Sequence, residues 1–185
     1  MAEVLPTRQP VLDDRLVVFG AGAFAMQAAP VATRFVLRMA APAAQAAGFG
    51  LAMALNRFTL SGACLAMRPG PDEYWLIGPD VSGLADQITA DLGPAWHSLV
   101  DIGHRNFGLQ LSGRAVCDVL NAGCPLDLHL AAFPVGMATR TLLGKAEIVL
   151  ARLETETFRL ECGRSFAPYV RDFLGEAARE WRAAA

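Results

Sequence analysis

Apolar and polar residues begin to alternate at Thr33, with the period of a β-strand. Phe35, Leu37 and Met39 would share one face of this strand. Residues 69–72 (Pro-Gly-Pro-Asp) form a strong turn sequence between two apolar runs, which predicts a β-hairpin. The elements expected in this half are a strand at about 33–39, a helix at about 43–54, strands at about 63–68 and 73–78, a helix at about 82–92 and a strand at about 96–102. This β-α-β-β-α-β order is that of a ferredoxin-like lobe.

The second half repeats this theme less regularly. Its last segment has an apolar stripe opposite a partly acidic face, which predicts a helix docked on the core rather than in a membrane. The stripe consists of Phe166, Tyr169, Val170, Phe173, Leu174, Ala177 and Trp181. The elements expected here are a strand at about 107–111, a helix between 112 and 123, strands at about 139–143, 146–153 and 156–162, and a helix at about 166–181.

These elements predict an α+β fold of two related ferredoxin-like lobes, with antiparallel-rich sheets covered by helices. The lobes would span about 33–98 and 99–185 and together form one domain, 33–185. That length suits a single domain with a shared core.

Residues 1–32 are interpreted as an N-terminal arm, because they contain three prolines and no sustained period. The arm nevertheless carries apolar side chains that need cover from water. They are Val17, Val18, Phe19, Phe24 and Met26. We expect the arm to dock on another protein chain rather than on its own domain, because terminal arms need such an anchor to be ordered.

The composition is more apolar than that of most soluble domains, with 54% hydrophobic and 18% charged residues. Such a chain has enough apolar surface both to fold and to meet a partner. The net charge of −2 and the pI of about 5.9 argue against a nucleic-acid-binding protein.

The charges are unevenly distributed, because no acidic residue lies between Asp14 and Asp72. That stretch contains five arginines, namely Arg15, Arg34, Arg38, Arg57 and Arg68. Two interpretations stay open. The arginines are either dispersed and solvated, or they form a surface that meets an acidic partner.

The chain shows no sequence signal for a membrane or for export. Two uncharged runs, at 16–33 and 39–56, are near the lower length limit of a membrane span. Both contain glutamine, glycine and proline, so neither is interpreted as transmembrane. The N-terminus has Asp13 and Asp14 where a signal peptide would be basic. We therefore expect a cytoplasmic protein.

The residues that usually carry chemistry do not fall into catalytic or metal-binding patterns. The four cysteines have no CxxC spacing, and the three histidines form no metal-ligand motif. Neither G-x-S-x-G nor H-E-x-x-H occurs. Asp101 and His104 could be an acid–base pair, but a turn with local hydrogen bonds is favoured. The sequence thus predicts no catalytic, cofactor-binding or metal-ligating residue.

A strand followed by Gly20, Gly22 and Ala25 resembles the G-x-G-x-x-A fingerprint of dinucleotide sites. That fingerprint needs an acid roughly 20 residues further on, for the ribose, and none occurs before Asp72. The following helix would also have to pass through Pro30. A nucleotide site is therefore not predicted.

Several blocks in order resemble the gamma subunit family of heterotetrameric sarcosine oxidase. The resemblance covers about 33–181 and is densest after Leu99. The blocks lie at 99–113 (LVDIGHRNFGLQLSG), 123–128 (GCPLDL), 133–136 (FPVG), 139–150 (TRTLLGKAEIVL), 158–161 (FRLE) and 164–169 (RSFAPY).

The same half is more faintly similar to the first part of glycine-cleavage aminomethyltransferases, which implies an aminomethyltransferase-like fold. Those folate-binding proteins have paired aspartates at the opening of a strand. The corresponding positions here are Ala146 and Glu147, so the first carboxylate is missing.

The resemblance to the gamma family implies a non-catalytic, structural subunit of a cytoplasmic heterotetramer with larger alpha and beta subunits and a small delta subunit. Such a complex oxidises sarcosine to glycine and hydrogen peroxide, and passes a one-carbon unit to tetrahydrofolate. FAD, FMN, NAD and the tetrahydrofolate site are expected in the partner subunits and none in this chain. Two alternatives stay open: a stand-alone folate-binding, aminomethyltransferase-like protein, and an orphan homo-oligomeric binding module.

Overall fold

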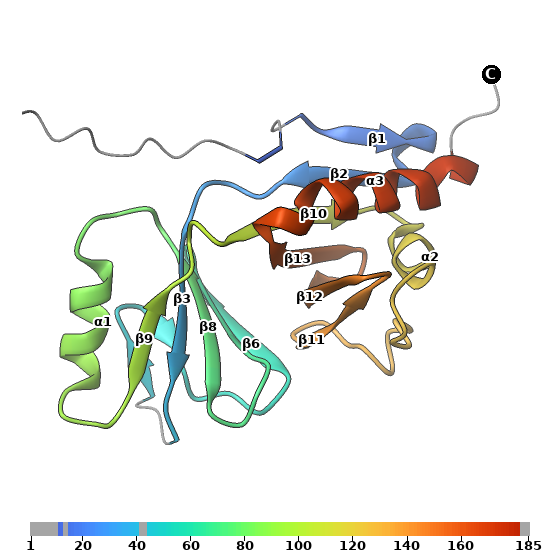
Figure 1. Cartoon of the computed structure of the whole chain (residues 1–185). Helices are drawn as coiled ribbons and strands as arrows, with labels where there is room; N and C mark the ends of the chain where they lie inside the picture. Colours follow the sequence, from blue (N-terminus) through green and yellow to red (C-terminus); the bar gives the residue numbers. More distant parts are fainter. Residues whose placement is uncertain (1–10, 13–14, 41–43, 182–185) are drawn as a thin grey trace, which may run out of the picture.

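Among the described residues, two large antiparallel sheets pack together, one covered on its outer side by a single helix and the other by two (Figure 1). The computed structural model describes residues 11–12, 15–40 and 44–181. The strand order is β6-β7-β8-β3-β9 in the five-stranded sheet and β1-β2-β10-β13-β12-β11 in the six-stranded sheet. This architecture confirms the expected α+β class with antiparallel-rich sheets.

The five-stranded sheet is formed by the first half of the chain. Its strands are β3 (Thr33–Arg38), β6 (Arg57–Ser61), β7 (Cys64–Arg68), β8 (Glu73–Gly78) and β9 (Ser98–Asp101). The outer face carries α1 (Leu84–Leu92) and a short hairpin of β4 (Gln45–Ala46) and β5 (Phe49–Gly50). The hairpin expected around residues 69–72 is confirmed, because β7 and β8 pair antiparallel.

The helix expected at about 43–54 is wrong. Within the described part of this segment, β4 and β5 are joined by a tight turn in which Ala47 and Gly48 have positive φ angles of 47° and 83°. Phe49, Leu51 and Met53 are buried and alternate with more exposed residues. That alternation is typical of extended chain, and it outweighs the helix preference of the alanines.

The six-stranded sheet contains β1 (Val17–Phe19), β2 (Phe24–Ala28), β10 (Asn106–Ser112), β11 (Ala138–Leu143), β12 (Ala146–Glu154) and β13 (Thr157–Gly163). Its outer face packs on α2 (Val116–Asn121) and α3 (Ala167–Ala177). Three short 3-10 turns complete the structure, η1 (Gly20–Gly22), η2 (Arg164–Phe166) and η3 (Ala178–Trp181).

The expectation that the N-terminal arm docks on another chain is wrong for residues 17–28. These residues form β1 and β2, and β2 pairs antiparallel with β10. Phe19, Phe24 and Met26 are buried in the same core as α3. Their apolar surface is therefore covered by their own domain. Residues 1–10 of the arm lie outside the described residues.

The final helix packs on the core as expected, with Val170 and Leu174 fully buried. Tyr169 and Phe173 are partly buried beside them. Phe166 is the exception in the expected stripe, because it lies in η2 before the helix begins and is largely exposed.

The inner faces of the two sheets meet in a third, smaller core. Its members are Leu65, Met67, Trp75, Ile77, Ile102, Ala138, Val149 and Ala151. Backbone hydrogen bonds from Phe58 to Gly136 and from Ala138 to Asn56 also join the two sheets. The layers are therefore helix, sheet, sheet and helix. Within the described residues, no helix has both the length and the apolar content that a membrane span requires.

Candidate functional site

The glycine-rich segment forms a turn in a hairpin, with a geometry unlike that of a dinucleotide site. Gly20–Gly22 is the 3-10 turn η1 between β1 and β2, which pair antiparallel. A dinucleotide site instead places phosphate at the N-terminus of a helix that directly follows the glycines. The two glycines serve the turn itself, since their φ angles are +52° and +87°.

Replacing Gly20 by alanine is expected to lower the free energy of unfolding by about 2–4 kcal/mol, because its φ is positive and its new Cβ would overlap the carbonyl oxygen of Trp181. Gly22→Ala is the matched control. Its Cβ would meet open space, so only the backbone cost of about 1 kcal/mol is expected. Urea denaturation of both variants measures the difference, and equal losses would contradict the close approach of η3 to this turn.

Asp101 and His104 form a turn, as favoured from the sequence. The Gly103 backbone N–H donates to Asp101 Oδ1 over 2.7 Å. The N–H groups of Arg105 and Asn106 both donate to the Ile102 carbonyl at 3.0 Å. Asp101 therefore shapes the connection between β9 and β10.

Three of the four cysteines have thiol pKa values above the ordinary value. All four are free, and burial raises the pKa of Cys64 and Cys117. Burial, reinforced by the Glu161 carboxylate, raises the pKa of Cys162 to about 12, although Arg34 opposes the shift. Because the thiolate is the reactive form, Cys162 is inert at neutral pH. The described residues contain no group of three or more histidine, cysteine or acidic side chains that could hold a metal ion.

One buried carboxylate, Glu161 of β13, connects the two sheets. Arg34 of β3 donates from Nε to Glu161 Oε2 at 2.8 Å, and both side chains are buried. Arg159 donates from Nε to Oε1, also at 2.8 Å. Gly108 leaves room for this cluster, because a Cβ there would overlap Glu161 Oε1. The negative charge of Glu161 is therefore compensated by two arginines.

A second buried carboxylate, Glu73 of β8, also lies at the junction of the sheets. Arg140 of β11 donates to its Oε1 at 2.6 Å, and the Trp75 indole N–H donates to the same atom at 2.7 Å. Arg38 lies 3.0 Å from Oε2. Both oxygens of Glu73 are thus occupied by donors, which leaves the carboxylate poorly suited to act as a general base.

Three arginines of the acid-free stretch bind groups within this chain. Arg34 and Arg38 bind the two buried carboxylates. Arg68 donates to the carbonyls of Met53 and Pro71. The interpretation of this stretch as a surface for an acidic partner is therefore wrong for the buried Arg34, and it stays a prediction for Arg38, whose side chain is half exposed.

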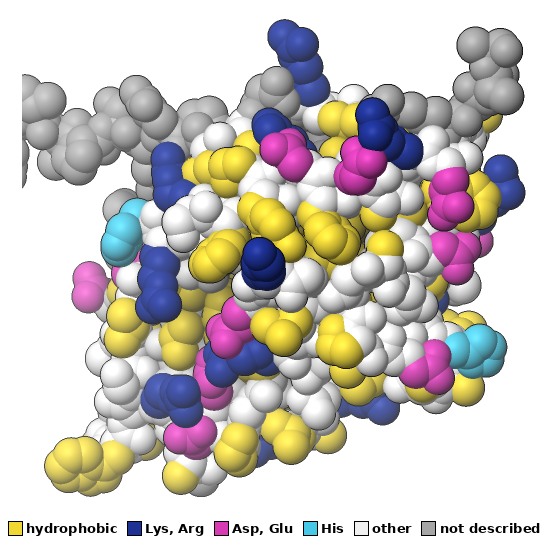
Figure 2. Space-filling model, turned by 45° about the vertical axis from the view of Figure 1, so that its right-hand side comes forward, with side chains coloured by type: hydrophobic (Ala, Val, Ile, Leu, Met, Phe, Trp, Pro, Cys, Tyr) yellow, Lys and Arg dark blue, Asp and Glu magenta, His cyan; other side chains and the backbone are white. Residues whose placement is uncertain are grey.

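A cleft of about 280 Å³ opens between the two sheets, and we name it the inter-sheet cleft. Val36, Trp75, Ile102 and Val149 contribute its apolar lining, and its charged lining residues are Glu73, Arg105, Arg140, Glu147 and Glu161. Figure 2 shows one face of the molecule, on which hydrophobic side chains gather in the middle with basic and acidic side chains around them.

The position that corresponds to the second aspartate of the aminomethyltransferases lines this cleft. Glu147 is exposed there, 3.6 Å from Arg140. Ala146, at the first position, is fully buried in the core. The paired carboxylates of the aminomethyltransferases are therefore reduced here to one solvated side chain.

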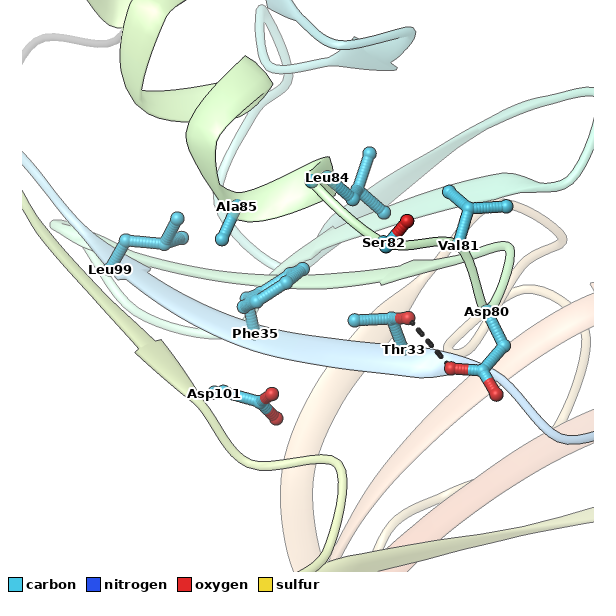
Figure 3. Close-up of a pocket in the computed structure, with 10 residues that line it drawn as sticks. Thr33, Phe35, Asp80, Val81, Ser82, Leu84, Ala85, Leu99 and Asp101 are labelled. Carbon is cyan, nitrogen blue, oxygen red and sulfur yellow. Dashed lines mark hydrogen bonds between the residues drawn. The ribbon is translucent and has the colours of Figure 1, made fainter. Parts of the chain in front are cut away.

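A second hollow, of about 440 Å³, lies on the opposite face of the five-stranded sheet, and we name it the α1 pocket. Figure 3 shows Phe35 in its middle, with Asp80 and Asp101 on either side. The Thr33 hydroxyl donates to Asp80 Oδ1 at 3.3 Å and to the Pro79 carbonyl at 3.1 Å. The pocket thus has an apolar centre and an acidic margin.

The pairing of Glu73 and Glu161 with their arginines was not predicted. Along β13, Phe158, Leu160 and Cys162 face the core, so Glu161 falls on the face that a single sheet would expose. The second sheet buries that face, and no local pattern reports such a long-range contact.

Solved structures with a similar fold define the class of protein. A structure of glycine cleavage system aminomethyltransferase T from Bartonella henselae matches with a TM-score of 0.61 and 12% identity, over 85% of this chain and 47% of that one. This match shows the fold alone. The chain therefore has the aminomethyltransferase-like α+β fold.

The sequence and the structure together define the family within that class. Residues 35–180 match the model of the sarcosine oxidase, gamma subunit family. The sarcosine oxidase subunit gamma of an Arthrobacter species is 37% identical over 86% of this chain and 78% of its own length. That of Corynebacterium sp. (strain P-1) is 33% identical over 60% of this chain and 55% of its own length. The chain belongs to the sarcosine oxidase gamma subunit family.

A solved relative agrees with this assignment. The structure of heterotetrameric sarcosine oxidase from Corynebacterium sp. U-96, in complex with pyrrole 2-carboxylate, contains a chain that matches with a TM-score of 0.79 and 27% identity. The match covers 91% of the present chain and 90% of that chain.

Proposed function

We propose that this chain is a non-catalytic, structural gamma subunit of a heterotetrameric sarcosine oxidase. The observation that carries the proposal is the match over nine tenths of both chains to a subunit of such a complex. The site geometry supports a structural role, because Glu73 and Glu161 are both held by arginines. Cys162, with its raised pKa, offers no nucleophile.

In this proposal the chemistry belongs to the partner subunits. The complex oxidises sarcosine to glycine and hydrogen peroxide and transfers the one-carbon unit to tetrahydrofolate. The larger alpha and beta subunits hold FAD, FMN, NAD and the tetrahydrofolate site. A small delta subunit completes the complex, which works in the cytoplasm. Ala146 supports the placement of folate chemistry outside this chain, since it replaces one of the paired aspartates of the aminomethyltransferases.

The purified chain is expected to be colourless and to produce no peroxide from sarcosine. Co-expression with the larger subunits is expected to yield one co-eluting complex that is yellow and active. The measurements are the visible absorption spectrum after gel filtration and a peroxide assay on both preparations.

Two outcomes would count against the proposal. A flavin band that stays with the isolated chain through gel filtration would assign it a cofactor of its own. Saturable binding of tetrahydrofolate to the isolated chain, measured by calorimetry, would favour the aminomethyltransferase-like alternative. Light scattering measures the mass of the isolated chain in solution, and the mass of a homo-oligomer would favour the homo-oligomeric alternative.

A further inference from the structure

The last strand of the five-stranded sheet, β9, has an unpartnered edge. It pairs with β3 on one side, and no strand within the described ranges pairs with its other side. Ile102 donates its N–H to the Arg34 carbonyl of β3, at 2.9 Å. Because backbone groups alternate in an antiparallel pair, Leu99 and Asp101 direct theirs away from β3. An additional strand could therefore hydrogen-bond there.

A hollow lies on each face of the sheet beside this edge. Leu99 and Asp101 line the α1 pocket together with Phe35. Val36, which pairs with Val100 of β9, lines the inter-sheet cleft with Ile102. Successive side chains of a strand point to opposite faces, so an added strand would direct them alternately toward the pocket and toward the cleft.

The edge is also apolar and exposed. Val100 is 52% exposed, and Trp96, two residues before the strand begins, is 98% exposed. Natural edge strands are protected by charges, proline, bulges or shortness; β9 is a short strand of four residues with one charge, Asp101, and it has no lysine, proline or bulge. An exposed tryptophan beside such an edge is typical of the anchor residues of protein interfaces.

The charges beside the edge specify the occupant. Asp101 borders the α1 pocket, and none of the described residues that line the pocket is basic. Arg105 lines the cleft on the other face, and its guanidinium has no ion-pair partner among the described residues. A second copy of this chain would bring two acidic pockets together. The pattern instead fits a segment with a basic side chain toward the pocket and an apolar or acidic one toward the cleft.

We propose that β9 binds an extended segment of a partner subunit, which adds a sixth strand to this sheet by β-augmentation. The segment alternates basic side chains, directed to Asp101, with apolar or acidic side chains, directed to Val36, Val100 and Arg105. This inference rests on the proposed role as a subunit and assigns the surface through which that role is performed.

The test compares Val100→Lys with Val18→Lys in the co-expressed complex. Val18 is the matched control, since it is the middle residue of edge strand β1 in the other sheet and is 51% exposed. Val100→Lys is expected to weaken co-purification with the larger subunits at least tenfold, whereas Val18→Lys leaves it unchanged. Equal retention of both variants, or a larger loss for Val18→Lys, overturns the proposal. Failure of the wild-type chain to assemble would contradict the proposed function instead.

Amide hydrogen exchange measures the backbone hydrogen bonds of β9 directly and needs no substitution. The amides of Leu99 and Asp101 are expected to exchange at least tenfold more slowly in the complex than in the isolated chain. Exchange that is unchanged on assembly overturns the proposal. The proposal is also overturned if these amides are already protected in the isolated chain and lose that protection when residues 1–10 are deleted. In that case the added strand would be the chain's own N-terminus.

Discussion

Replacing Glu161 by glutamine is expected to lower the free energy of unfolding of the isolated chain by about 3–5 kcal/mol. The substitution keeps the shape of the side chain but removes the charge that compensates Arg34, which is buried with it. A buried guanidinium without its counter-charge retains the cost of leaving water and loses the attraction that offset it. Urea denaturation, monitored by far-UV circular dichroism, measures the loss.

A double-mutant cycle shows whether the loss comes from the ion pair. Arg34→Met and Glu161→Met are each expected to be strongly destabilising, and the double variant less so than the sum, because apolar residues can replace a complete buried pair at little cost. Glu147→Gln is the matched control. That carboxylate is exposed on the neighbouring strand β12, so its loss should cost at most about 1 kcal/mol. Additive losses in the cycle would mean that the two side chains stabilise the fold independently.

The parts of the fold predicted from the sequence are those with strong local signals. The hairpin of β7 and β8 follows from residues 69–72, whose prolines and glycine leave few alternatives to a turn. Helix α3 follows from apolar positions repeated at helical spacing. Val170 and Leu174, which belong to the stripe expected for α3, are fully buried.

The parts that were missed depend on tertiary pairing. β1 and β2 are only three and five residues long, too short for a persistent alternation, and they are strands because β10 offers an edge for β2. The segment around Phe49 was rich in alanine and therefore favoured a helix. The burial of every second residue in this segment depends on the packing of Phe49 and Leu51 against the five-stranded sheet.

The candidate site illustrates the same limit. Its carboxylates come from β8 and β13, and their partners from β3 and β11, so each cluster joins residues distant in the chain. Glu73 belongs to none of the sequence blocks, and Glu161 ends the block 158–161, which by itself does not reveal the arginine that it binds. The resemblance to the gamma family, by contrast, depended on ordered blocks of sequence, and the family match over residues 35–180 confirms it.

Arg152→Met is expected to lower the free energy of unfolding by about 2–5 kcal/mol. Arg152 of β12 is buried, and its Nη1 donates to the carbonyls of Leu128 and Phe133 at 3.0 and 2.7 Å. Its Nη2 donates to the Thr155 carbonyl at 2.8 Å, and the guanidinium lies over the Phe158 ring. Methionine fills similar space but donates no hydrogen bond, so two carbonyls of buried residues lose their donor.

The loop between α2 and β11 should respond most strongly to this change, because Arg152 is the donor that joins its carbonyls to the six-stranded sheet. Limited proteolysis is therefore expected to cleave Arg152→Met first within residues 122–137, at a protease concentration that leaves the wild type intact. Arg57→Met is the matched control. Arg57 is exposed, without a side-chain hydrogen bond in the described part of the chain, and its loss should stay within about 0.5 kcal/mol. Equal stability of the two variants would mean that packing around Phe158, and not the guanidinium, positions the loop.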